Sequence, residues 1–188
     1  MKDNIQSLIF LDIDGPISTD KNKEIQFNLG RSTSSYNILL PRGPILNLKG
    51  IVDNIPNCNI ILSSNWRLNP DTRLVEEPLY NIIPSPARIN LERQLNSFGI
   101  YISDETPYFN KNRSMEIGLY LEGFRQRYNY IPPYIIIDNE ISDLKLLYKG
   151  HIVYCSNENG LTKEGVNISI NLLRKFRAEV LISKGIYI

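Results

Sequence analysis

Three apolar segments of this chain end on acidic or hydroxyl side chains, and this pattern constrains the fold more than any other feature. Ser7–Asp12 reads SLIFLD, Asn59–Leu62 reads NIIL and runs into two serines, and PYIIIDNE carries its apolar run into Asp138. Strands without polar alternation are typically buried on both faces, as in parallel sheets. A fourth short segment, HIVYC at residues 151–155, has the same character. The sequence therefore predicts a parallel sheet covered by helices on both faces.

Helical patterns lie between the predicted strands. We expect helices over Pro44–Ile55, Arg88–Ser97 and Ser114–Tyr128, and a closing helix after Thr162, a favourable N-terminal capping residue. Alternating strands and helices predict an α/β fold with a three-layer, Rossmann-like parallel sheet. Segment 16–43 is polar and broken by prolines and glycines, so we expect an irregular loop or hairpin there. Such a segment would form a short flap, or minimal cap, over the strand ends.

Length and composition set the broad class. A chain of 188 residues fits a single domain spanning 1–188. Lys and Arg total 21 against 20 for Asp and Glu, so the net charge does not predict a polyanion partner, although a local basic groove is compatible with it. Cys58 and Cys155 lie in or beside apolar strands, and we expect reduced, inert thiols. The sequence has neither a secretory signal nor an apolar run of membrane-spanning length, so we expect a cytoplasmic protein without membrane contact.

Acidic and hydroxyl side chains are predicted to meet at one edge of the sheet. Ligands of open parallel sheets bind at the carboxyl ends of the strands. Asp12, Asp14, Ser63 and Asp138 all follow such ends, and Asp143 comes five residues after Asp138. Carboxylates gathered there repel one another unless a hard cation compensates, and Mg²⁺ suits a few carboxylates together with phosphate oxygens. One acid of the opening pair could attack phosphorus, and the other could carry the proton of the leaving group.

The order of these residues resembles a known superfamily. DIDG after an apolar strand, ILSS on the next strand, a basic residue before a third strand and then IIIDNEISD are similar to the four motifs of the haloacid dehalogenase (HAD) superfamily. SSNWR, TPYFNKNRSMEI, IIIDN and NGLT further resemble the HAD domain of Swiss Army Knife RNA repair proteins. The resemblance spans roughly residues 7–175. Each acid taken alone would also suit an ordinary turn or helix cap, so the order of the motifs carries the interpretation.

The resemblance implies roles at the first two motifs. Asp12 matches the nucleophile and a metal ligand. Asp14 matches the general acid/base, and its main-chain carbonyl is also placed on the metal. The presence of this second acid favours phosphate-ester chemistry over dehalogenation. Ser63 matches the hydroxyl that binds phosphoryl oxygens, with Ser64 as a neighbouring alternative.

The later motifs imply the cationic and metal-binding positions. Lys111 or Arg113 would stabilise charge on the transferred phosphoryl group. Asp138 matches the acid that binds Mg²⁺, and Asp143 matches the second acid of that motif. Asn139 stands where many relatives carry a further acid, which predicts a weaker metal site.

Three residues after the second strand are candidates for substrate contacts. Asn65, Trp66 and Arg67 could bind a nucleobase and a phosphate, although a core tryptophan beside a structural arginine is an equal alternative. We expect an Mg²⁺-dependent phosphomonoesterase whose substrate is a phosphate on a nucleotide or on an RNA or DNA end. A basic and aromatic helix end, FRQRYNY at residues 124–130, would support such a substrate. The alternatives are a small-metabolite phosphatase and a non-catalytic module that binds RNA ends.

Overall fold

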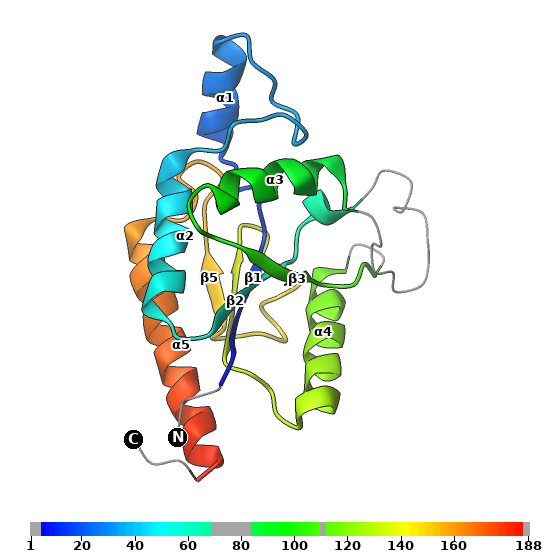
Figure 1. Cartoon of the computed structure of the whole chain (residues 1–188), viewed down its shortest axis with the longest axis vertical. Helices are drawn as coiled ribbons and strands as arrows, with labels where there is room; N and C mark the ends of the chain where they lie inside the picture. The colour runs from blue at the N-terminus through cyan, green and yellow to red at the C-terminus, as the bar shows by residue number, and fades with distance from the viewer. Residues whose placement is uncertain (1–4, 69–83, 110–111, 186–188) are drawn as a thin grey trace.

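The computed structural model describes residues 5–68, 84–109 and 112–185. Five parallel strands form one sheet in the order β3-β2-β1-β4-β5, and helices cover both of its faces (Figure 1). The strands are β1 (Ser7–Leu11), β2 (Cys58–Leu62), β3 (Ile102–Glu105), β4 (Tyr134–Asp138) and β5 (Ile152–Tyr154). The helices are α1 (Asp20–Asn28), α2 (Arg42–Asn54), the 3-10 turn η1 (Asn65–Arg67), α3 (Pro86–Asn96), α4 (Arg113–Tyr128) and α5 (Lys163–Ser183). The predicted three-layer α/β architecture is confirmed.

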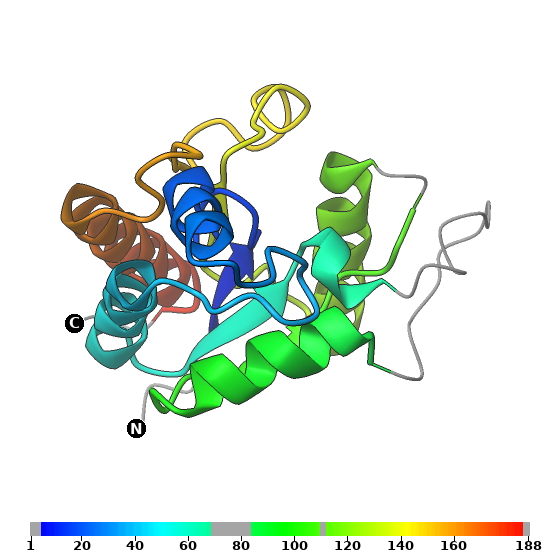
Figure 2. The ribbon, with the colours of Figure 1, turned by 90° about the horizontal axis from the view of Figure 1, so that it is seen from above.

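Alternate residues of the central strand enter two separate cores. Ile9 and Leu11 point into the larger core, which also contains buried side chains of α2, α3 and α5. Leu8 and Phe10 point into the smaller core, which contains Ile117 and its neighbours on α4. Because successive side chains of a strand face opposite sides, a strand that feeds two cores must be apolar throughout. Viewed from above, α2 and α5 lie together on one side of the sheet and α4 lies on the other (Figure 2).

The predicted strands and most predicted helices agree with the structure to within two residues at their ends. The capping prediction also holds, because the Thr162 side chain accepts a hydrogen bond from the main chain of α5. The sequence from Asn69 to Phe98 has mixed periodicity and several prolines, and part of this stretch lies outside the described residues. Within the described ranges, no helix combines the length and the hydropathy that a membrane span needs. Burial raises the pKa of Cys58 and of Cys155 to about 12, so both free thiols stay protonated near neutral pH.

Helix α1 was not expected, because segment 16–43 was predicted to be irregular. The helix begins after Thr19, whose side chain accepts a hydrogen bond from Asn22 N at 3.2 Å. Of its nine residues only Asn22 and Gln26 are buried, so no apolar stripe marks it in the sequence. The prediction of irregular structure was wrong because the helix is stabilised by a polar cap and polar contacts rather than by an apolar face.

Strand β3 was also missed. Its sequence, ISDE, holds two acids in four residues, and it lies at the edge of the sheet with β2 as its one neighbouring strand. The register between the two strands shifts between Ile60 and Ile61. An edge strand with two acids, of which Asp104 is exposed and Glu105 is buried, lacks the continuous apolar run that revealed the central strands.

The inner face of α2 gives a test of this packing. Leu48 is completely buried in the larger core, whereas Leu46 on the same helix is 45% exposed. Leu48→Ala should lower the free energy of unfolding by about 2–5 kcal/mol through lost burial and a residual cavity. Leu46→Ala is the matched control, and its urea denaturation midpoint should stay close to that of the wild type. Equal shifts for the two variants would contradict the assigned orientation of α2.

Candidate active site

The strand register brings three polar residues to one level at the carboxyl edge of the sheet. Leu11, the last residue of β1, pairs with Leu62 of β2 and with Ile137 of β4. Asp12 and Ser63 follow β1 and β2 directly, and Asp138 ends β4. Main-chain hydrogen bonds continue the ladder by one step, since Asp12 N donates to Ile137 O at 3.0 Å and Ser63 N donates to Leu11 O at 2.9 Å. The predicted convergence of Asp12, Ser63 and Asp138 follows from this register.

Two of these residues share one guanidinium group. Arg113 Nη1 lies 3.2 Å from Asp12 Oδ1 and 2.9 Å from Asp138 Oδ2. Asp12 is 6% exposed and Asp138 is 1% exposed. Burial raises the pKa of Asp12, and it raises that of Asp138 to about 7, in each case against the opposing charge of Arg113. One guanidinium cannot neutralise two buried carboxylates when both are ionised, so a second cation would stabilise the cluster.

The cation at the two acids is Arg113, the first residue of α4. Burial acts to lower the pKa of its guanidinium, but the charges of Asp12 and Asp138 outweigh that effect and raise it. Lys111, the alternative that the sequence left open, lies outside the described residues.

Asp14 has a different environment from Asp12. Its side chain is 49% exposed, and both of its oxygens are engaged. Lys23 Nζ of α1 lies 2.9 Å from Oδ1, and the indole Nε1 of Trp66 donates to Oδ2 at 2.8 Å. Two donors on one carboxylate fix its orientation. The acid pair of the DIDG motif is thus split into a buried member and a solvent-accessible, oriented member.

Asn139 packs directly against the loop of the acid pair. One end of its side-chain amide lies 2.8 Å from the main-chain oxygen of Asp14 and 3.1 Å from Asp12 Oδ2. The other end lies 2.6 Å from Asn157 Oδ1. A Cβ atom added at Gly15, whose φ is +88°, would come within 2.6 Å of the Asn139 side chain. Glycine is therefore required at position 15 both for its backbone conformation and for this close approach.

The oxygens around Asn139 fit a hard divalent cation. The Asp12 carboxylate, the Asp14 carbonyl and the Asn139 amide approach one another closely, and Asp138 adds a second buried carboxylate nearby. Oxygen ligands of this kind suit Mg²⁺. No group of three Asp, Glu, His or Cys residues with metal-binding geometry occurs in the described ranges, so the main-chain oxygen of Asp14 would have to complete the set, with the Asn139 amide nitrogen donating to it and to Asp12. Asp143 contacts the first turn of α4, where its Oδ2 accepts a 3.4 Å hydrogen bond from Ser114 N.

The two serines after β2 present hydroxyl groups beside Asp12. The Ser64 hydroxyl forms a hydrogen bond with Asp12, which acts to lower the pKa of that acid. Ser63 Oγ is buried, and among the described residues it has no hydrogen-bond partner. Buried hydroxyls are nearly always paired, so an unpaired one at the level of Asp12 in the sheet is a natural place for an incoming oxygen atom.

The three predicted substrate contacts divide between surface and interior. Asn65 is exposed, whereas Trp66 is 4% exposed and Arg67 is 1% exposed. Arg67 forms an ion pair with Glu116 at 2.7 Å and donates to the main-chain oxygens of Ser64 and Thr106 at 2.6 and 3.0 Å. The structural alternative is therefore the one observed for Trp66 and Arg67. Trp66 orients Asp14, and Arg67 fixes the loop that carries the serines.

A cavity of about 500 Å³ adjoins Arg113. It lies beside the acid cluster, and its lining is polar. The residues that line it are Asn65, Asn112, Arg113, Glu116, Glu140, Ser142 and Asp143. This space can receive the group attached to a phosphate that contacts Arg113.

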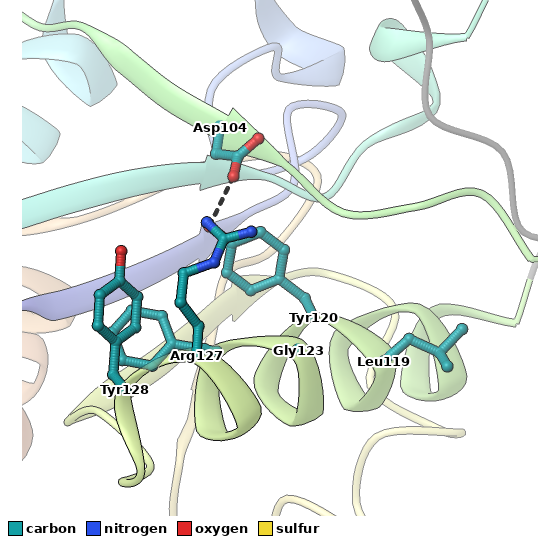
Figure 3. Close-up of a pocket in the computed structure, with 7 residues that line it drawn as sticks. Asp104, Leu119, Tyr120, Gly123, Arg127 and Tyr128 are labelled. Carbon is teal, nitrogen blue, oxygen red and sulfur yellow. Dashed lines mark hydrogen bonds between the residues drawn. The ribbon is translucent and has the colours of Figure 1, made fainter.

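The basic and aromatic end of α4 lies far from this cavity. Arg127 and Tyr128 line a separate pocket of about 230 Å³, in which Tyr120 donates a 2.9 Å hydrogen bond to Asp104 of β3 (Figure 3). Fourteen residues of helix separate Arg113 from Arg127, which corresponds to about 21 Å along the axis. Segment 124–130 was expected to help bind the substrate at the strand ends. Its position at the other end of α4 does not bring it to that site.

Sequence reasoning did not identify Lys23 or Asn157, nor the role of Asn139, in the site. Lys23 was hidden within segment 16–43, although the spacing of Thr19 and Asn22 is typical of a helix start. Asn157 lies two residues before the NGLT motif of residues 159–162, and nothing local in the sequence links it to Asn139.

The buried ion pair behind the serine loop gives a test of the site's framework. Glu116→Gln should leave the Arg67 guanidinium without its counter-charge and lower the free energy of unfolding by about 3–5 kcal/mol. Glu122→Gln on the same helix removes an exposed ion pair with Arg125 and is the matched control, for which we expect no measurable shift. The measurement is chemical denaturation of the three proteins, and a Glu116→Gln variant as stable as the wild type would show that Arg67 does not depend on this partner.

Comparison with known proteins places this geometry in a family. The family model described as "HAD domain in Swiss Army Knife RNA repair proteins" matches residues 8–166. Neither a curated protein nor a solved structure gave a match. The matched span contains all five strands, apart from the first residue of β1, and it contains every acid of the site. The chain therefore belongs to the family of HAD domains found in Swiss Army Knife RNA repair proteins, within the class of HAD-type hydrolases.

Proposed function

We propose that this protein is an Mg²⁺-dependent phosphomonoesterase that works through an aspartyl-phosphate on Asp12. One observation carries the proposal: Asp12 is a buried carboxylate that lies level with the unpaired hydroxyl of Ser63 and in contact with Arg113. A nucleophile flanked by a free donor and a cation is arranged to receive a tetrahedral phosphate dianion.

The first step forms one bond and breaks another. An oxygen of Asp12 attacks phosphorus, and the bond between phosphorus and the ester oxygen breaks. Asp14, in its protonated form, gives its proton to the departing alkoxide. Lys23 and Trp66 both contact the Asp14 carboxylate, so the ion pair with Lys23 must loosen when the carboxyl group takes up a proton.

The second step hydrolyses the aspartyl-phosphate. Asp14, now ionised, takes a proton from a water molecule as that water attacks phosphorus. The bond between phosphorus and the Asp12 oxygen breaks, which releases inorganic phosphate and restores the carboxylate. Asp14 is thus the acid of the first step and the base of the second, a double duty that requires an accessible and oriented carboxyl group.

The remaining residues hold the phosphoryl group and the cation. Arg113 and the hydroxyl of Ser63 would contact the phosphoryl oxygens. The Ser64 hydroxyl would keep its hydrogen bond with Asp12. Asp12 and Asp138 would hold Mg²⁺ together with the main-chain oxygen of Asp14, and Asn139 adjoins this set. The chemistry that bound Mg²⁺ supplies in such a site is neutralisation of phosphate charge and orientation for in-line attack.

The substrate that we propose is a phosphate on a nucleotide or on an RNA or DNA end. The flap is short, and a cavity of about 500 Å³ leads away from Arg113, so a large leaving group can be accommodated. The family membership gives a reason to place RNA ends among the candidates. A small-metabolite phosphatase would use the same acids. The two substrate classes therefore differ in how the protein binds the leaving group and not in the chemistry at phosphorus.

The nucleophile assignment is tested by one substitution. Asp12→Asn should abolish Mg²⁺-dependent release of phosphate, because an amide does not form the acyl-phosphate. Asp53→Asn, which changes an exposed acid on α2 that pairs with Lys49, is the matched control and should keep full activity. Phosphate release is measured on 3′- and 5′-phosphorylated oligonucleotides, nucleotides and sugar phosphates. Turnover by Asp12→Asn at the rate of the wild type would refute the mechanism, and wild-type protein that only binds the oligonucleotides would support a non-catalytic module.

The acid/base assignment has a sharper signature. Asp14→Asn should slow hydrolysis of alkyl phosphates by roughly two to four orders of magnitude, because their leaving groups need a proton. Aryl phosphates, whose leaving groups are weaker bases, should lose less in the first step. The measurement is the single-turnover rate of phosphorylation for one alkyl and one aryl ester. A loss of the same size for both esters would remove Asp14 from the role of general acid.

A further inference from the structure

The flap helix α1 carries its apolar side chains on the outside. Asn22 and Gln26 are its buried residues, whereas Ile25, Phe27 and Leu29 are exposed. A helix that packs against its own protein normally buries its apolar side chains and exposes its polar ones. The reversed arrangement of α1 suits a helix whose outer surface contacts something other than this chain.

Phe27 lies on the same side of α1 as Lys23, the residue of this helix whose side chain reaches Asp14. It follows Lys23 by four residues, and side chains at this spacing lie one above the other on a helix. Lys23 Nζ is 2.9 Å from Asp14 Oδ1, so this side of the helix leads to the site. Phe27 stands about 6 Å further along the axis, which is the scale of one nucleotide. Figure 1 shows α1 rising from the strand ends away from the body of the protein.

Exposure favours Phe27 over the other aromatic side chain of the site. Phe27 is 73% exposed, the highest value for an aromatic side chain in the described part of the chain. Trp66, which the sequence suggested as a stacking residue, is 4% exposed and has its indole N–H on Asp14. A base that enters above the acids can therefore reach the ring of Phe27 but not that of Trp66.

The exposed apolar residues of α1 do not form one patch. Ile25 and Leu29 share a side of the helix because they are four residues apart, whereas Phe27 is two residues from each and points elsewhere. A protein partner would need a contiguous apolar surface. A single ring next to a lysine, above a phosphate site, instead suits a planar base joined to a phosphate.

From this placement we infer that Phe27 stacks on a base at the phosphorylated end of a single-stranded substrate whose phosphate lies at Asp12. The inference rests on the proposed function, and it names the base as the recognised part of the leaving group. Stacking on an aromatic ring tolerates all four bases, so Phe27 gives affinity for a base without sequence specificity.

The test compares strands with and without a terminal base. Phe27→Ala should raise the KM for a short 3′- or 5′-phosphorylated oligonucleotide by about 5- to 100-fold, with kcat little changed, because one stacking contact is lost. The same variant should leave the KM unchanged for an oligonucleotide whose terminal nucleotide is abasic, and for ribose 5-phosphate. The dissociation constant of each labelled strand, measured by fluorescence anisotropy with the Asp12→Asn protein, should respond to Phe27→Ala in the same way without depending on turnover.

Two further variants separate stacking from general loss of apolar surface. Phe27→Trp should restore the KM, whereas Leu29→Ala, which truncates a side chain that is 60% exposed on the other side of α1, should have no effect. Equal losses for base-bearing and abasic strands, or equal losses from Leu29→Ala and Phe27→Ala, would overturn the inference. Anisotropy that responds to Phe27 while no phosphate ester is hydrolysed by the wild type would instead overturn the proposed function.

Discussion

Two carboxylates buried around one guanidinium are the interaction on which the rest of this site depends. Asp12 and Asp138 lie 3.2 and 2.9 Å from Arg113, and an unpaired charge in this place would cost several kcal/mol. The pairing requires β1 and β4 to be neighbours in register, and it requires α4 to begin with Arg113 at their ends. The fold therefore satisfies an electrostatic condition at the edge of the sheet as well as the burial of its apolar strands.

The same condition separates the two acids of the first motif. Asp12 sits inside the protein, where burial raises its pKa and one guanidinium is shared with a second acid. Asp14 projects outward and is held by one cation and one indole N–H. Two residues along an extended chain share a direction, but β1 ends at Leu11 and a turn begins at Gly15, so Asp14 has a different environment from Asp12. A buried acid that stays in place and an accessible acid that exchanges protons are the two kinds of group that a two-step phosphoryl transfer requires.

The central sheet could be predicted from the sequence because its strands are apolar on both faces, as SLIFL and YIII show, and such strands are typical of a parallel sheet covered by helices. The convergence of Asp12, Ser63 and Asp138 followed from that prediction, since parallel strands place their carboxyl ends together. Helix α1 and strand β3 could not be found this way, because one is held by a polar cap and the other is an acidic edge strand. Whether Trp66 and Arg67 face solvent depends on Asp14 and Glu116, partners 52 and 49 residues distant in sequence. Local pattern carries no information on such contacts.

The flap is held by hydrogen bonds where it begins, and the outer turn of α1 is exposed. Asp20 N donates to Asn157 O at 2.8 Å, and Leu161 N donates to Pro16 O at 2.8 Å, so the start of the flap is tied to the loop before α5. Gly160 permits this contact, because a Cβ atom there would come within 2.8 Å of the Pro16 oxygen. Asn157 of the same loop also contacts Asn139, which lies against both acids. A displacement of the first residues of the flap would therefore move the groups that contact Asp12 and Asp14. The outer turn of α1, where Phe27 and Leu29 are exposed, can contact a ligand without such a displacement.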